Sequence, residues 1–187
     1  MSSPTSAPTA PLAAPAGTPP AKVNGSASHT ISLLVNNKPG VLIRIALVFA
    51  RRGYNLDSLV VSPGADERFS RMTITASGDP KTLVQIIGQL NKLVDVIHAR
   101  DHTGEVVVER ELVLMKLSCT AEQRTEVLQI AEHFKCQTVD FTESTLMLQS
   151  TGNTAKLDAL IMMLRKFDII ETVRTGKIIM ARGTEET

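Results

Sequence analysis

The stretch NNKPGVLIRIALVFARRGYNLDSL, residues 36–59, carries the strongest structural signal in the chain. It predicts a helix over residues 39–52, because Pro39 suits the first turn of a helix and Gly53 suits the position just after its end. Apolar side chains fall on nearly every face of this helix, which is more than one small core can bury. Asn37 precedes the helix and Asn55 follows it. The helix therefore needs more cover than its own sheet supplies.

The segments around this helix alternate between strand and helix patterns. The predicted order is strand, helix, two strands, helix and strand, at residues 29–36, 39–52, 54–62, 69–77, 80–93 and 94–101. Asp79 stands where it can cap the second helix. This order is typical of a βαββαβ module, in which two helices cover one face of a four-stranded sheet.

The second half of the chain repeats this order. Strands are predicted over 109–118, 137–144, 145–151 and 169–182, and helices over 121–134 and 154–167, the first of them capped by Thr120. The apolar face of the helix at 80–93 also returns 74 residues later, as Leu83, Ile86, Ile87, Leu90 and Leu93 become Leu157, Leu160, Ile161, Leu164 and Phe167. The sequence therefore predicts an α+β protein with two ferredoxin-like βαββαβ modules in tandem.

Residues 1–28 differ in composition from the rest of the chain. They hold six of the nine prolines, many alanines, serines and threonines, and a single charge at Lys22. Such a segment buries too little apolar surface to offset the entropy of ordering it, so we predict a disordered tail. Its prolines interrupt any secretory core and it has no arginine for an organelle transit peptide, which favours a cytoplasmic protein.

The composition also excludes several classes of partner. The chain has 187 residues and a net charge of +1, which gives no basic field for nucleic acid. Aromatic residues make up 3% of the chain and tryptophan is absent, so platforms for stacking bases are scarce. No segment reaches the length of a membrane span. Cys119 and Cys136 are predicted to be reduced, packed thiols.

The open faces of the two sheets predict self-association. Leu33, Val35, Val60 and Met72 are apolar strand residues that we expect on sheet surfaces left bare by the helices. Such surfaces and the strand edges beside them favour association with another chain. An oligomer is therefore expected.

Catalytic and metal-binding patterns are missing from the sequence. It has no glycine-rich phosphate loop and no dinucleotide fingerprint. His98 and His102 are four residues apart, a spacing that suits metal ligands on a helix, but this segment is predicted to be strand and turn. We therefore interpret them as residues of a solvated strand end.

The start of the helix at 39–52 is the best candidate for a ligand site. First-turn amides have no partners within a helix and, with the helix dipole, attract a carboxylate. If Pro39 is the first helical residue, these donors include Gly40, Val41 and Leu42, while Asn37 and Asn55 offer amide groups. An α-amino acid needs such donors, acceptors for its ammonium group and an apolar wall. The alternative is that Pro-Gly merely starts a helix and each asparagine merely caps or turns the chain.

The chain resembles the family of small, regulatory subunits of acetohydroxyacid synthase (acetolactate synthase). The resemblance covers about residues 29–183. It rests on NNKPGVLIRIALVFARRGYNLDSLVV, which is followed by SRMTIT, LNKLVDV and VEREL, and then on VDFTES, TGNTAKLDALI and IETVRTGKIIMARG. It implies three segments: the tail at 1–28, an ACT domain at 29–104 that senses an amino acid, and a C-terminal ferredoxin-like domain at 105–187.

The resemblance also implies a function. Family members are not catalytic; they activate a separate large subunit that carries thiamine diphosphate, Mg²⁺ and FAD, and they confer feedback inhibition, typically by valine, with leucine and isoleucine as other candidates. ACT domains of the family pair as homodimers with effector sites at the interface. The effector-binding residues of the family fall on Asn37, Gly40, Val41, Leu42 and Asn55. This chain differs beside the site, with Asn36 where the family often has Glu and Leu56-Asp57 where it often has Ile-Glu.

Three other functions compete with this interpretation. An amino-acid sensor of another biosynthetic enzyme would share the ACT domain but not the motifs of the second half. An RNA-binding βαββαβ protein needs exposed aromatic side chains on its central strands, and residues 69–77 offer only Phe69. A stand-alone enzyme needs a catalytic constellation, which the sequence lacks.

Overall fold

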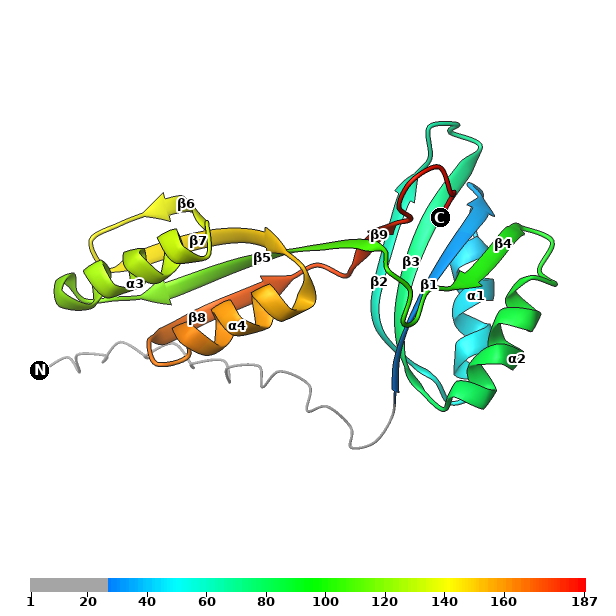
Figure 1. Cartoon of the computed structure of the whole chain (residues 1–187), viewed down its shortest axis with the longest axis horizontal. Coiled ribbons are helices and arrows are strands. Elements are labelled where there is room, and N and C mark those ends of the chain that lie inside the picture. The colour runs from blue at the N-terminus through cyan, green and yellow to red at the C-terminus, as the bar shows by residue number, and fades with distance from the viewer. Residues whose placement is uncertain (1–26) are drawn as a thin grey trace, which may run out of the picture.

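Two modules lie at opposite ends of an elongated molecule in the computed structural model, which describes residues 27–187 (Figure 1). The tail predicted over 1–28 lies outside this range except for its last two residues, which begin the first strand. Each module has two helices on one face of an antiparallel sheet, which confirms the predicted α+β fold of two tandem βαββαβ units.

The first module has the order β2-β3-β1-β4 in its sheet. Its elements are β1 (Ala27–Asn36), α1 (Val41–Ala50), β2 (Asn55–Pro63), β3 (Phe69–Gly78), α2 (Pro80–Leu90) and β4 (Val96–Asp101). Alternate residues of the central strands point toward the helices and meet apolar residues of α1 and α2 there. Among the buried core residues are Ile31, Leu33, Val35, Ile45, Phe49, Met72, Ile74 and Ile86.

The second module has the equivalent order β6-β7-β5-β8, with a short extra strand, β9, beside the beginning of β5. Its elements are β5 (Val108–Ser118), α3 (Ala121–His133), β6 (Gln137–Phe141), β7 (Thr145–Gly152), α4 (Thr154–Leu164), β8 (Asp168–Arg174) and β9 (Ile178–Met180). The strand residues predicted over 169–182 thus form two strands, because the chain leaves this sheet after β8. Both cysteines are free thiols, Cys119 buried and Cys136 half-buried, as predicted.

The repeat of the helix face is confirmed by burial. The two helices α2 and α4 bury equivalent residues, Leu83, Ile86 and Leu90 in the first module and Leu157, Leu160 and Leu164 in the second. The predicted caps are also present: Asp79 accepts from the amide of Thr82, and Thr120 accepts from the amide of Gln123. The two modules are therefore built on the same local sequence rules.

The open face of the first sheet differs from the prediction. Leu33, Val35 and Met72 lie under the helices, because their strands place the apolar set of alternate residues on that side. The opposite face carries polar residues such as Ser32 and Thr73, which are nevertheless buried. These three apolar residues therefore give no reason for an oligomer.

The cover on this face comes from the chain itself. The segment after β4 lies over it, and His102, predicted at a solvated strand end, is 3% exposed. The Nε2 atom of His102 is 2.8 Å from the hydroxyl of Ser32, and its Nδ1 atom is 2.8 Å from a carboxylate oxygen of Glu105. This contact with His102 is the first cause of a lowered pKa at Glu105. The hydrogen bonds fasten the connection between the modules to the first sheet.

Two chain passages, not one, connect the modules (Figure 1). The chain enters the second module along the beginning of β5 and returns along β9, which pairs with residues 108–110 of β5. Lys177 and Glu109 form an ion pair of 3.2 Å between the passages. Beyond β9, the chain runs back to the first sheet, where the main-chain oxygen of Thr187 accepts from Arg71 at 2.5 Å. We call residues 105–110 and 175–180 the ribbon.

None of the helices in the described part of the chain combines the length and the apolar character needed to cross a membrane.

Candidate functional site

Helix α1 starts two residues later than predicted. Its first residue is Val41, not Pro39. Gly40 precedes it, and the φ of 84° and ψ of −8° of Gly40 lie in the left-handed region that favours glycine. The preceding residues form a tight turn, in which the amide of Lys38 donates to the carbonyl of Asn36. The helix therefore begins at Val41, and Gly40 is its N-cap without any side-chain capping bond.

This start leaves main-chain donors unused. The amide of Val41 makes only a long bond of 3.4 Å to the carbonyl of Lys38. Within residues 27–187, the amides of Gly40, Leu42 and Ile43 donate to no carbonyl and to no side chain. Ile43 was absent from the predicted set because the helix was predicted to start earlier. The first turn thus presents the unpaired donors that a carboxylate would accept from.

Asn37 lies at the same end of the first module as Gly40. Its main-chain amide donates to the carbonyl of Arg68 at 2.8 Å, and its side-chain Nδ2 donates to the carbonyl of Glu67 at 3.0 Å. Together these two bonds hold Asn37 against the β2–β3 turn. They leave its Oδ1 atom, an acceptor suited to an ammonium group, without a donor from residues 27–187.

Asn55 is held at the opposite end of α1, where β2 begins. Its Nδ2 donates to Oδ1 of Asp57 at 2.9 Å, and Asp57 also accepts from the hydroxyl of Ser77. Asp57 is one of the positions at which the chain differs from the family pattern, so that difference contacts a predicted site residue directly.

The neighbour of Asn55 anchors this end of the strand. Tyr54 donates its hydroxyl to the main-chain carbonyl of Asp79, and burial is the first cause of the raised pKa of its hydroxyl. A Cβ on Gly78 would lie 2.3 Å from the Tyr54 ring, so glycine is required where this ring packs.

One chain does not bring the predicted residues together. Asn36 pairs with Phe69 of β3, whereas Asn55 pairs with Ser77 of the same strand. Eight residues of β3 separate these pairs, which corresponds to roughly 26 Å along a strand that rises about 3.3 Å per residue. Asn37, Gly40, Val41 and Leu42 therefore share one end of the sheet, and Asn55 lies at the other.

An exposed apolar stripe runs along α1 between these two ends. Val41, Ile45 and Phe49 are buried against the sheet, while Leu42, Ile43 and Leu47 are 42%, 66% and 45% exposed. Beside the helix lies β2, an edge strand of the first sheet. We call Leu42, Ile43 and Leu47 the α1 stripe. It is the unburied apolar face that the sequence predicted for this helix.

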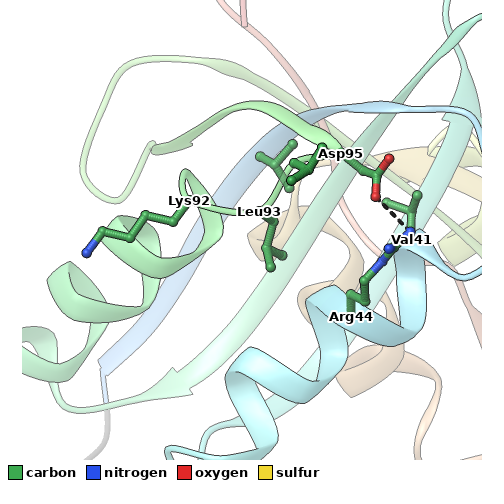
Figure 2. A pocket seen from close by; sticks show the side chains of 7 residues that line it. Val41, Arg44, Lys92, Leu93 and Asp95 are labelled. Atoms are coloured by element: carbon green, nitrogen blue, oxygen red, sulfur yellow. Dashed lines mark ion pairs between the residues drawn. The ribbon is translucent and has the colours of Figure 1, made fainter.

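A pocket near the start of α1 is lined by only one of the predicted residues (Figure 2). Its volume is about 190 Å³, below the roughly 300–1,000 Å³ typical of small-molecule sites. Val41 and Arg44 line it from α1, and Arg44 forms an ion pair of 2.7 Å with Asp95, which also lines it (Figure 2). The pocket therefore does not gather the donors of the first turn and the two asparagines into one cavity.

The side chains around α1 do not form a metal or acid–base centre. Across residues 27–187, no group of three or more His, Cys, Asp and Glu residues has an arrangement that could hold a metal ion. What the region offers is a set of main-chain donors, amide groups and an apolar surface. Donors, acceptors and an apolar surface are the groups that a small zwitterion needs from its site.

The fold and this helix start define the class of protein as one with an ACT domain and a second βαββαβ domain. Residues 31–98 match the profile of the family described as "AHAS small subunit-like ACT domain", and residues 110–183 match that described as "Small subunit of acetolactate synthase". The chain thus belongs to the family of acetolactate synthase small subunits.

Individual relatives agree with this assignment. The chain is 42% identical over 158 residues to the "Probable acetolactate synthase small subunit" of Archaeoglobus fulgidus, covering 84% of this chain and 99% of that one. It is 40% identical over 156 residues to the acetolactate synthase small subunit of Mycobacterium bovis, covering 83% and 93%. The crystal structure of the Thermotoga maritima small subunit aligns with a TM-score of 0.76 at 35% identity, covering 85% of this chain and 99% of that one.

Proposed function

We propose that this chain is the regulatory subunit of an acetolactate synthase, which activates the catalytic large subunit and makes it sensitive to feedback inhibition by valine. The chain would not be catalytic itself, and thiamine diphosphate, Mg²⁺ and FAD would belong to the large subunit. The observation that carries the proposal is the start of α1, where free main-chain donors adjoin an exposed apolar stripe.

The effector site is composed of two chains in this proposal. A twofold axis beside the α1 stripe would pair the α1 helices of two copies in antiparallel directions, and such a self-complementary contact is typical of homodimers. The first turn of one helix would then face the end of the other, bringing Gly40 and Asn37 of one chain toward Asn55 of its partner. The separation of these residues within a single chain supports this arrangement.

Each group at the start of α1 has a defined role toward the amino acid. The amides of Val41, Leu42 and Ile43 would donate to the carboxylate, which the positive end of the helix dipole also stabilises. Oδ1 of Asn37 would accept from the ammonium group. The α1 stripe would supply the apolar wall for a branched side chain, which favours valine over polar amino acids and leaves leucine and isoleucine as competitors.

Activation is assigned to surfaces outside this site, including the second module. Valine binding and activation should therefore respond to different substitutions. The test is to reconstitute the chain with its catalytic subunit and measure acetolactate formation while valine, leucine and isoleucine are titrated separately. Activity of the isolated chain, or a holoenzyme that is neither activated nor inhibited, would overturn the proposal.

A mixing experiment tests the two-chain site. Gly40→Asp disables the first-turn half and Asn55→Ala disables the other half, with an expected loss of about 2–10-fold in affinity for the latter. In a hybrid dimer of the two variants, one site combines the wild-type Gly40 of one chain with the wild-type Asn55 of the other. Mixing should therefore restore wild-type valine sites that neither parent has. A mixture that titrates as the sum of its parents would place the whole site within one chain.

A further inference from the structure

Two sequence motifs with no part in the proposed effector site, VEREL and RTG, contact each other beside the ribbon. VEREL contains Glu111 at the entry of β5 into the second sheet, and the RTG sequence places Arg174 at the exit of β8. The side chain of Glu111 is 5% exposed, and one of its oxygens lies 2.5 Å from Nε of Arg174. A buried carboxylate is costly unless it is paired, so this contact holds the two passages together where they leave the module.

The arginine is itself fixed on the helix side. Its Nη1 atom forms an ion pair of 2.6 Å with Asp158 of α4, and the hydroxyl of Thr154 donates to the second oxygen of Glu111 at 2.5 Å. Arg174 therefore ties the end of β8 both to β5 and to the first turns of α4. The second module and the beginning of the ribbon form one hydrogen-bonded unit.

Thr175 continues this attachment by one residue. Its amide donates to the carbonyl of Leu112 at 2.9 Å, and its hydroxyl accepts from the amide of Leu112 at 2.9 Å. The hydroxyl thus replaces the carbonyl that a regular strand would supply. The two passages therefore leave the second module in a fixed register, and rotation of one must carry the other.

Gly176 then touches the first module. A Cβ at this position would lie 2.9 Å from Oγ of Ser58, 2.9 Å from Cγ2 of Val60 and 3.0 Å from Cβ of Ser58. The φ angle of Gly176 is outside the left-handed range, so its backbone would accept alanine and only space is missing. Both contacts belong to β2, the strand that begins with Asn55.

We propose that Arg174, Thr175 and Gly176 form a mechanical joint that passes the state of β2 to the second module. Valine that binds Asn55 shifts or stiffens β2, Ser58 and Val60 press on Gly176, and the ribbon turns the second module through Thr175 and Arg174. The part that concerns valine rests on the proposed function. The mechanical link between β2 and the second module does not depend on it.

The test is Gly176→Ala in the full chain. The added methyl group should push the ribbon away from β2 and separate binding from inhibition. Valine affinity, measured by calorimetry on the chain alone, should stay near the wild-type value. The valine concentration for half-inhibition of the reconstituted holoenzyme should rise about tenfold or more, the range of a typical coupling between sites.

Two further variants make the result specific. Gly88→Ala adds the same methyl group at a helix position with no neighbour within 4 Å and should leave inhibition unchanged. Adding Ser58→Gly and Val60→Ala to Gly176→Ala removes all three crowded atoms and should restore inhibition. Normal inhibition in Gly176→Ala, an equal loss of valine binding, or no rescue would overturn the joint.

Hydrogen exchange tests the link without an effector. Gly176→Ala should raise amide exchange both in residues 55–63 of β2 and at Leu112 and Thr175, and the rescuing substitutions should reverse both changes. A rise in amide exchange confined to β2, or confined to Leu112 and Thr175, would show that the contact does not couple β2 to the second module. A wild-type chain that neither binds valine nor confers inhibition would instead overturn the proposed function, and the exchange data would still decide the joint.

Discussion

The first helices of the two modules, α1 and α3, occupy equivalent places but begin in opposite ways. In α3, Thr120 and Gln123 form a reciprocal capping box, and Glu122 places a negative charge in the first turn. In α1, Gly40 offers no side-chain cap and the first turn has no acidic residue. Residues at the start of α3 accept from its first main-chain amides, whereas the corresponding amides of α1 have no such partner within residues 27–187.

The exposed faces of these helices differ in the same sense. The exposed residues of α3 are polar apart from Ala121 and from Leu128, which is 37% exposed, whereas α1 presents the α1 stripe. A capped helix with a polar surface is complete without a partner. An uncapped helix with an apolar surface is less stable alone, and this difference supports our proposal that α1 binds the effector and a second copy of the chain.

The largest expected effect comes from placing a charge on each helix surface. Leu47→Glu buries a carboxylate in the proposed dimer contact, which should weaken dimerisation by about 3–5 kcal/mol, roughly 100-fold or more in the dissociation constant. Leu128→Glu makes the same change on α3 and should leave the dimer intact. Sedimentation equilibrium measures both. Equal behaviour of the two variants would remove the distinction between the helix surfaces.

The next effect concerns the free donors of α1. Gly40→Asp places a carboxylate beside the amides that we assign to valine, and the loss of one charge-assisted contact should cost about 1.5–3 kcal/mol, a tenfold or greater loss of affinity. Gly40→Asn is the matched control, because Asn and Asp tolerate the left-handed conformation similarly and only Asp is charged. Calorimetry with valine compares them, with circular dichroism to check folding. Equal losses would assign the effect to backbone strain.

A smaller effect is expected at the start of α3, where Thr120 already accepts from the main-chain amide of Gln123. Thr120→Ala removes the cap of α3 and should destabilise the protein by about 1 kcal/mol, while valine affinity stays unchanged. Urea unfolding followed by helix signal measures the first quantity, and calorimetry measures the second. Weaker valine binding in this variant would mean that the second module contributes to the site.

The smallest effect should come from the charge in the first turn of α3. Glu122→Gln keeps the shape of the side chain but removes its interaction with the helix dipole, which should cost about 0.3–1 kcal/mol at low salt. The cost should shrink when salt is added, because surface charges are screened. Urea unfolding at two salt concentrations measures this. A cost that is independent of salt would exclude the dipole as its cause.

Local chemistry made much of the fold predictable. The buried faces of α2 and α4 follow from apolar spacing alone, and Asp79 and Thr120 cap because their side chains reach nearby amides. The start of α1 was placed too early because Pro-Gly permits both a first helical turn and the tight turn that is present. The left-handed φ of Gly40 distinguishes these two conformations, and the neighbouring residues of the sequence do not determine that angle.

Long-range features were the main source of error. The alternation of Ile31, Leu33 and Val35 with Thr30 and Ser32 already indicates which side of β1 faces the helices. The sequence alone was therefore enough to predict that these apolar residues are covered by the helices. The cover on the polar face could not be predicted in this way, since it comes from a distant part of the chain, with His102 lying 70 positions after Ser32. The division of Asn37 and Asn55 between two ends of the sheet also depends on strand register. The site residues themselves remain a prediction.

The two passages of the ribbon give the second module the topology of an inserted domain. Because the chain leaves the first sheet after β4 and returns to it after β9, a single cut in either passage does not release the module. After a cut at Gly176, the fragments stay joined by the pairing of β9 with β5 and by the ion pair between Lys177 and Glu109. After a cut near Gly104, residues 105–187 stay attached to the first sheet through the contacts of Glu105 with His102 and of Thr187 with Arg71. A protease that nicks the exposed residues near Gly104 would therefore produce two bands on a denaturing gel from one intact particle. The same topology lets residues 111–174, which lie between the two passages of the ribbon, be replaced as a unit while the first sheet keeps both of its attachments.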